Sequence, residues 1–210
     1  MAGVREWVVA LRGGRRMLLA AVLGALLALA QPPLSCPWVL FAALPVLLWL
    51  MDGAGGPGAA FRIGWAAGTG HFGTALFWIV SPFMVEPEVF GWMAPFALGG
   101  MAGGLALFWA AAFGLSRAIW SPRPSRVLVL AALWTFAEFA RAHVLTGFPW
   151  GLQAYAWIET PVMQTAALFG PHLLGFLTLV AGLSLGLGTW RGAAVAARWQ
   201  TGICRSLTPA

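Results

Sequence analysis

Residues 134–155 read WTFAEFARAHVLTGFPWGLQAY, and this stretch shows how the chain folds. Its first half is apolar apart from Glu138 and Arg141, which stand three residues apart and therefore share one face of a helix. Gly147 and Pro149 then end that helix. Ionisable groups inside an apolar helix are costly and tend to be functional. The stretch therefore predicts a membrane-spanning helix that carries a polar pair and leads into a turn.

Composition extends this interpretation to the whole chain. Of the 210 residues, 60% are hydrophobic and 9% are charged, and the mean hydropathy is +0.84. A typical soluble domain has roughly 25% charged residues, and about 20 apolar residues cross a bilayer as a helix. We therefore predict an all-α fold, a polytopic transmembrane helical bundle of about six spans. The predicted spans are 17–30, 37–51, 61–80, 92–116, 126–145 and 162–189. The first two flank two prolines, and they form either a tight hairpin or one re-entrant feature.

The distribution of charge predicts the orientation. All twelve basic residues are arginines, and only Arg141 lies on the far side of the predicted membrane from the other eleven. Because cytoplasmic loops carry an excess of basic residues, we expect both termini in the cytoplasm and the 31–36, 81–91 and 146–161 connections outside. The net charge of +6 then reflects topology and contact with anionic lipid, and it predicts no binding of nucleic acid.

The chain contains one predicted domain with short ends. We assign residues 1–16 to a cytoplasmic basic N-terminus, 17–189 to the membrane domain and 190–210 to a short basic tail. The tail is too polar and too rich in arginine to insert readily into a membrane.

The usual catalytic and metal-binding patterns are not found in the sequence. Cys36 has no basic neighbour in its short loop to activate the thiol. His71, His143 and His172 fall on three different spans without the close spacing of a metal-binding helix, and we expect hydrogen-bonded packing for them. We therefore predict no catalytic residue, no metal site and no cofactor in this chain.

The aromatic residues after the fifth span are the candidates for recognition. Phe148, Trp150 and Tyr155 are either ordinary interfacial aromatics or the lip of a lipid-binding loop, because loops on rigid scaffolds often carry recognition. Glu138 and Arg141 beneath them form either a buried structural pair or a substrate-facing one. We favour pairing from their three-residue spacing, although Arg141 could instead hold a lipid phosphate, since its charge persists at any working pH.

These residues also carry a family resemblance. The order Trp134, Glu138, Arg141, Thr146-Gly147-Phe148-Pro149-Trp150 and Tyr155-Ala156-Trp157 resembles the membrane domain of apolipoprotein N-acyltransferase of Gram-negative and related bacteria. The resemblance covers about residues 17–189 and includes Phe61-Arg62-Ile63-Gly64-Trp65, Phe77-Trp78-Ile79 and the stretch 164–170. The chain departs from the family pattern at Ala154, where glycine is usual, and at Pro171-His172, where a more apolar or tyrosine-containing pair is common.

The resemblance implies a multi-pass protein of the bacterial inner membrane, with phospholipid and lipoprotein as partners. Enzymes of this family act in lipoprotein biosynthesis, and they transfer an acyl chain from a phospholipid to the amino group of the N-terminal diacylglyceryl-cysteine through a thioester acyl-enzyme. Their catalytic Glu, Lys and Cys belong to a nitrilase-like domain. The present chain has no lysine and stops soon after the sixth predicted span, so we expect a truncated acyltransferase that binds lipid without catalysis, with an aberrant tail at 190–210.

Two other functions remain open. The chain could be a lipid-handling or assembly subunit that recruits a separately encoded nitrilase-like protein. It could also be a different membrane enzyme, such as a diacylglyceryl transferase or an intramembrane protease, that uses Glu138, Arg141 and His143 directly.

Overall fold

The computed structural model describes residues 2–144 and 147–187, and within these ranges all regular structure is helical, without a strand. The α-helices in chain order are α1 (Ala2–Ala10), α2 (Gly13–Leu29), α3 (Trp38–Asp52), α4 (Pro57–Ala75), α5 (Pro87–Phe90), α6 (Ala94–Ala118), α7 (Arg126–His143) and α8 (Ala166–Leu185). The 3₁₀ segments are η1 (Phe77–Met84), η2 (Gly91–Met93), η3 (Gln153–Trp157) and η4 (Pro161–Thr165). The predicted all-α class is confirmed for these residues. The predicted tail 190–210 lies outside them.

Each predicted span overlaps an α-helix, in the order α2, α3, α4, α6, α7 and α8, and the span 61–80 continues from α4 into η1. Over the described residues, two helical stretches, Pro87–Ala118 and Pro161–Leu185, are long and apolar enough to cross a membrane. The other helices are shorter or more polar: α2 has 17 residues and α3 has 15, against about 20 for a full crossing. A bundle of about six crossings therefore stays a prediction. Helix α1 was not predicted, because the sequence analysis treated its residues only as a basic N-terminus.

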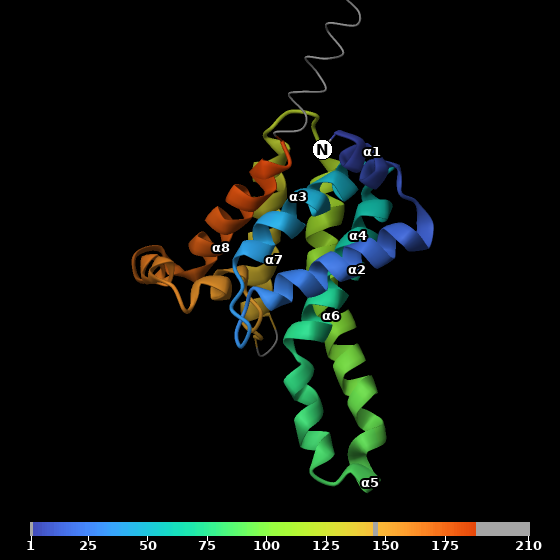
Figure 1. Cartoon of the computed structure of the whole chain (residues 1–210), viewed down its shortest axis with the longest axis vertical. Coiled ribbons are helices and arrows are strands. Elements are labelled where there is room, and N and C mark those ends of the chain that lie inside the picture. Colours follow the sequence, from blue (N-terminus) through green and yellow to red (C-terminus); the bar gives the residue numbers. More distant parts are fainter. Residues whose placement is uncertain (1, 145–146, 188–210) are drawn as a thin grey trace, which may run out of the picture.

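The helices pack around a central pair, α4 and α6 (Figure 1). Helix α2 packs against α4, α7 contacts both α6 and α8, and α3 contacts both α2 and α8. Small residues allow the close approach of α4 to its neighbours. A Cβ built on Gly68 would lie 2.9 Å from Ala106, and one built on Gly24 would clash with the backbone carbonyl of Ala67.

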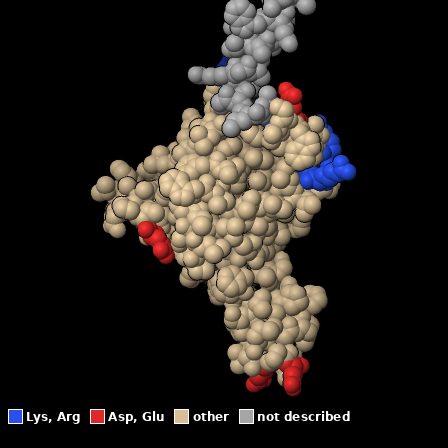
Figure 2. All heavy atoms as spheres, viewed as in Figure 1, with Lys and Arg blue, Asp and Glu red and all other residues tan. Residues whose placement is uncertain are grey.

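The two ends of the molecule differ in shape and charge. Segment η1 and the first part of α6 form a hairpin that projects beyond the rest of the bundle, with α5 at its tip (Figure 1). Helix α1 lies at the opposite end, together with the connection between α6 and α7. Figure 2 shows basic side chains together with acidic atoms near α1, and acidic side chains without basic ones at the hairpin tip. The gathering of basic side chains at one end agrees with the predicted orientation, which itself stays a prediction.

A cluster of aromatic rings fills the centre of the bundle. Trp109 and Trp134 are fully buried, and their ring centroids lie 4.5 Å apart in an edge-to-face arrangement. Phe113 packs on Trp134 at 5.0 Å, and Phe72 packs on Trp109 at 5.5 Å. His71 stacks on Trp109 at 4.8 Å. The rigid core therefore extends to the two α4 residues, His71 and Phe72, that contact the candidate site.

Candidate functional site

The connection after α7 reverses direction at Gly147. Its φ is +73°, a backbone conformation that residues with a Cβ rarely adopt, and a Cβ here would clash with the carbonyl of Ala142. The N–H of Phe148 then donates to the carbonyl of Arg141 at 3.0 Å, which folds the chain back over the helix end. The predicted end of the helix before Gly147 is confirmed, because α7 stops at His143.

Arg141 holds this connection from beneath. Its side chain is buried, and Nη1 donates to the carbonyl oxygens of Phe148 and of Trp150, the latter at 2.7 Å. The guanidinium carbon lies 4.9 Å from the ring centroid of Phe72, so the positive charge also rests on an aromatic face. A guanidinium carries several donors in a fixed plane, which suits it to bridge two carbonyls at once.

The favoured pairing of Glu138 with Arg141 is wrong as a direct contact. In the described part of the chain, the ion pairs within 4.0 Å both involve Asp52. Glu138 turns instead towards Gln153 and α8, where its Oε2 lies 3.9 Å from the position of a Cβ on Gly175. The two side chains leave one helix face and then diverge, because loop carbonyls are nearer to Arg141.

Two further side chains hold the same connection. His71 Nε2 lies 3.1 Å from the carbonyl oxygen of Gly151, and because a carbonyl only accepts, Nε2 is the donor. Gln31 Nε2 donates to the carbonyl of Leu152 at 3.1 Å. With Arg141, these residues form what we call the carbonyl clamp. The hydrogen-bonded packing predicted for His71 is confirmed. The sequence analysis missed Gln31, whose only signal was a lone amide between an apolar run and two prolines.

A small polar cluster lies between the clamp and α8. Glu138 and Gln153 are buried, with 2% and 1% of their surfaces exposed. Tyr155 lies beside them on η3, and burial raises the pKa of its hydroxyl above its ordinary value. Gln153 and Tyr155 belong to the segment that follows Trp150, so the cluster adjoins the loop on its α8 side.

The outer side of the clamped loop borders a groove of about 650 Å³. Its wall is mostly apolar and comes from three segments, namely the turn after α2, the start of η1 and the loop itself. Trp150 and Tyr155 both line it, and the Trp150 ring lies 5.8 Å from that of Trp78 across the groove. Phe148 packs against the hydrophobic core instead. Two of the three predicted aromatic residues therefore share one groove, and the third anchors the loop.

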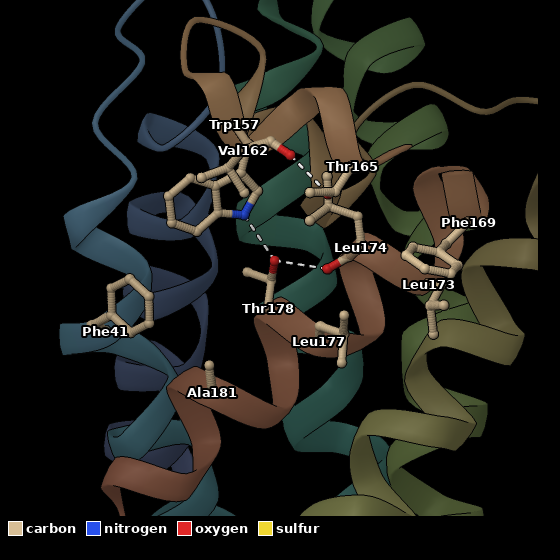
Figure 3. Close-up of a pocket in the computed structure, with 10 residues that line it drawn as sticks. All are labelled: Phe41, Trp157, Val162, Thr165, Phe169, Leu173, Leu174, Leu177, Thr178 and Ala181. Atoms are coloured by element: carbon tan, nitrogen blue, oxygen red, sulfur yellow. Dashed lines mark hydrogen bonds between the residues drawn. The ribbon is translucent and has the colours of Figure 1, made fainter. Parts of the chain in front are cut away.

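A second pocket, of about 320 Å³, opens between α3 and α8 (Figure 3). Its polar groups bond within the protein: Trp157 Nε1 donates to Thr178 Oγ1 at 2.8 Å, and that hydroxyl donates to the carbonyl of Leu174 at 2.8 Å. Apolar side chains such as Phe41 and Phe169 form the rest of the wall. The sequence analysis did not predict this pocket, which forms where Phe41 of α3 faces residues between 157 and 181.

Comparisons with known proteins cover most of the helical bundle that contains this site. The apolipoprotein N-acyltransferase N-terminal domain matches residues 23–184. The chain belongs to this family. It is similar to the apolipoprotein N-acyltransferase of Bradyrhizobium diazoefficiens, with 43% identity over 173 residues, which are 80% of this chain and 32% of the relative. The enzymes of Rhodopseudomonas palustris and Caulobacter vibrioides are 37% and 43% identical, over 85% and 77% of this chain and 34% and 31% of their own lengths.

The chain thus spans about a third of the length of the curated relatives it matches. The family match includes the clamp, the groove and the polar cluster, but not α1. The alternative that used Glu138, Arg141 and His143 as one catalytic group gains no support from the geometry. His143 Nδ1 bonds to the carbonyl of Phe139 at 2.8 Å, and in the described chain no hydrogen bond or ion pair joins any two of the three.

Proposed function

We propose that this chain is the membrane part of an apolipoprotein N-acyltransferase and that it holds the phospholipid acyl donor. The observation that carries the proposal is the groove beside Trp150, which has about 650 Å³ of space, mostly apolar walls and a rigidly held rim. An acyl chain needs apolar walls more than hydrogen bonds. The family relationship supplies the substrate class, phospholipid as donor and lipoprotein as acceptor.

The placement in the membrane is part of the proposal. We infer a bundle of about six spans in the bacterial inner membrane, with both termini in the cytoplasm and the groove near the outer surface. The helices that coincide with the predicted spans support this placement, as does the gathering of arginines at the α1 end (Figure 2). Trp150, with 55% of its surface exposed, would then stand at the depth where tryptophan is enriched in membrane proteins.

The role of each site residue follows from its contacts. Trp150 and Tyr155 form the rim of the groove and contact the lipid near its glycerol. Arg141 acts through the loop carbonyls, because it is buried and its Nη1 already has two acceptors. Phe148 and Glu138 support the loop from within. Holding the rim rigid before lipid arrives lowers the entropy cost of binding.

Lipid binding by this chain is not accompanied by turnover. The 210 residues contain no lysine, so the Glu, Lys and Cys expected from the family resemblance are not all present in them. Intact-mass analysis after incubation with phospholipid tests this, and we expect no acyl adduct on Cys36. A mass increment removed by hydroxylamine would contradict it. A separately encoded nitrilase-like protein would use the same groove, and activity restored on adding such a protein would identify that arrangement.

Photolabelling tests the groove itself. The chain is placed in nanodiscs that contain a phospholipid with a diazirine at the end of one acyl chain, and labelled peptides are mapped by mass spectrometry. We expect labelling to concentrate at Trp78 and Ile158, which line the groove, and to fall several-fold in Trp150→Ala. Trp38→Ala is the matched control, because Trp38 is 76% exposed and does not line the groove. Equal labelling of all exposed apolar surfaces would refute the proposal.

A further inference from the structure

A compact charged site lies at the other end of the bundle, where α3 and α6 end and α7 begins. It is a pocket of about 350 Å³, called here the Asp52 pocket and lined by Arg5, Asp52, Arg117, Trp120, Pro122 and Arg126. We propose that the Asp52 pocket binds the phosphate group of an anionic phospholipid from the leaflet on that side of the membrane. The site is separate from the acyl-donor groove, and the proposal rests on the membrane placement given above.

Asp52 organises the pocket. Its Oδ1 lies 3.0 Å from Arg126 Nε and accepts from Trp120 Nε1 at 3.3 Å, while its Oδ2 accepts from Arg5 Nη2 at 3.2 Å. These partners come from α7, from the connection after α6 and from α1. One carboxylate at the end of α3 therefore ties three other segments together and fixes the directions of the guanidinium groups around it.

The lining carries more positive than negative charge. Three guanidinium groups face one carboxylate, so the lining has two positive charges in excess. Arg117 contributes most clearly, because its Nε and Nη2 donate to the carbonyl of Ala54 at 3.0 and 2.8 Å, and a neutral acceptor leaves its charge uncompensated. Arg5 shares Asp52 with Arg126, whose side chain is almost fully buried. Guanidinium groups held close together repel one another, and an anion between them relieves that repulsion.

The chemistry of the lining selects phosphate on a lipid. Guanidinium groups bind phosphate through paired, charge-assisted hydrogen bonds, and basic pockets on the cytoplasmic side of membrane proteins bind lipid headgroups. An indole beside them is typical of the interface between membrane and water. Trp120 and Pro122 add apolar surface to the lining itself. The acyl chains of a lipid can contact this surface, which a free phosphate ion would not need.

The first test needs no substitution. The purified chain is mixed in detergent with equal amounts of phosphatidylglycerol and phosphatidylethanolamine, and the retained lipid is measured by native mass spectrometry. We expect preferential retention of phosphatidylglycerol, whose net charge complements the excess positive charge. Equal retention of the two lipids would overturn the proposal. Displacement of phosphatidylglycerol by a modest excess of inorganic phosphate would show a free-phosphate site and would also overturn it.

Matched variants then locate the site. Arg117→Gln removes one charge and keeps a donor for the Ala54 carbonyl, whereas Arg123→Gln removes the same charge from an exposed residue that does not line the pocket. We expect Arg117→Gln to weaken phosphatidylglycerol binding about fivefold, which corresponds to about 1 kcal/mol per basic residue, and Arg123→Gln to weaken it less than about twofold. Equal losses would indicate general surface charge and refute the pocket. None of these substitutions should change photolabelling at the groove. Failure of the Asp52 pocket would therefore not count against the acyl-donor groove.

Discussion

Replacing Arg141 by methionine should release the loop that carries Trp150. Methionine fills similar space but cannot donate to the carbonyls of Phe148 and Trp150, which then lose both Nη1 bonds. A hydrogen bond from a charged group contributes about 1.5–3 kcal/mol, so two contribute about 3–6 kcal/mol. Relief from burying an unpaired guanidinium offsets part of this loss. We therefore expect a net destabilisation of about 3 kcal/mol.

The melting temperature in detergent and hydrogen exchange measure this effect. A change of about 3 kcal/mol corresponds to about 6–12 °C for a domain of this size. Exchange should rise mainly at residues 147–158, because the helices keep their own packing. Arg62→Met, at an exposed arginine on α4, is the matched control and should shift the melting temperature by no more than about 2 °C.

The Glu138→Gln variant distinguishes the carbonyl clamp from a buried ion pair between Glu138 and Arg141. If Glu138 and Arg141 were a buried pair, removing either charge would cost about 3–5 kcal/mol. With Arg141 bound to loop carbonyls, Glu138→Gln should cost only about 1 kcal/mol, near the average for single substitutions. Equal losses in the Arg141 and Glu138 variants, without a local rise in exchange at the loop, would refute the clamp.

Three other predictions test the site and the topology. His71→Leu should destabilise the chain by about 1–3 kcal/mol in thermal unfolding and raise hydrogen exchange at the loop, because the Gly151 carbonyl loses its donor. The control, His143→Leu at an exposed position, should change stability by less than about 0.5 kcal/mol. Gly147→Ala should lower stability by at least about 1 kcal/mol, while Gly99→Ala, where a Cβ meets nothing within 4 Å, should leave it unchanged or raised; loss at both positions would contradict the strained turn. An impermeant thiol reagent applied to intact cells should not label Cys204, and labelling there would overturn the predicted orientation.

Local sequence was sufficient to predict where the main helices lie and where α7 ends. The apolar runs predicted as spans overlap α2, α3, α4, α6, α7 and α8, because hydropathy is a property of neighbouring residues. Gly147 marked the turn for the same reason, since only glycine adopts its positive φ without strain. The family was also readable from the order of residues between Trp134 and Trp157, and the match over residues 23–184 confirms it.

Helix α1 was not predicted from local sequence. A basic segment before the first span predicts a cytoplasmic location, but it does not predict a short helix that packs on α3. That helix is stabilised by a partner 47 positions away, because Arg5 bonds to Asp52. Short helices depend on tertiary contacts for their stability.

The contacts of the site were decided by the tertiary structure. Spacing correctly placed Glu138 and Arg141 on one helix, but it could not say that carbonyls of the following loop would lie closer to Arg141 than the glutamate does. Gln31 reaches Leu152 across 121 positions of sequence, and His71 reaches Gly151 across 80. A buried carbonyl takes whichever donor the packed helices bring to it. The sequence by itself therefore determined which segments are helices and which family they belong to, while the packing of α4 and α7 decided which side chains hold the loop and shape the groove.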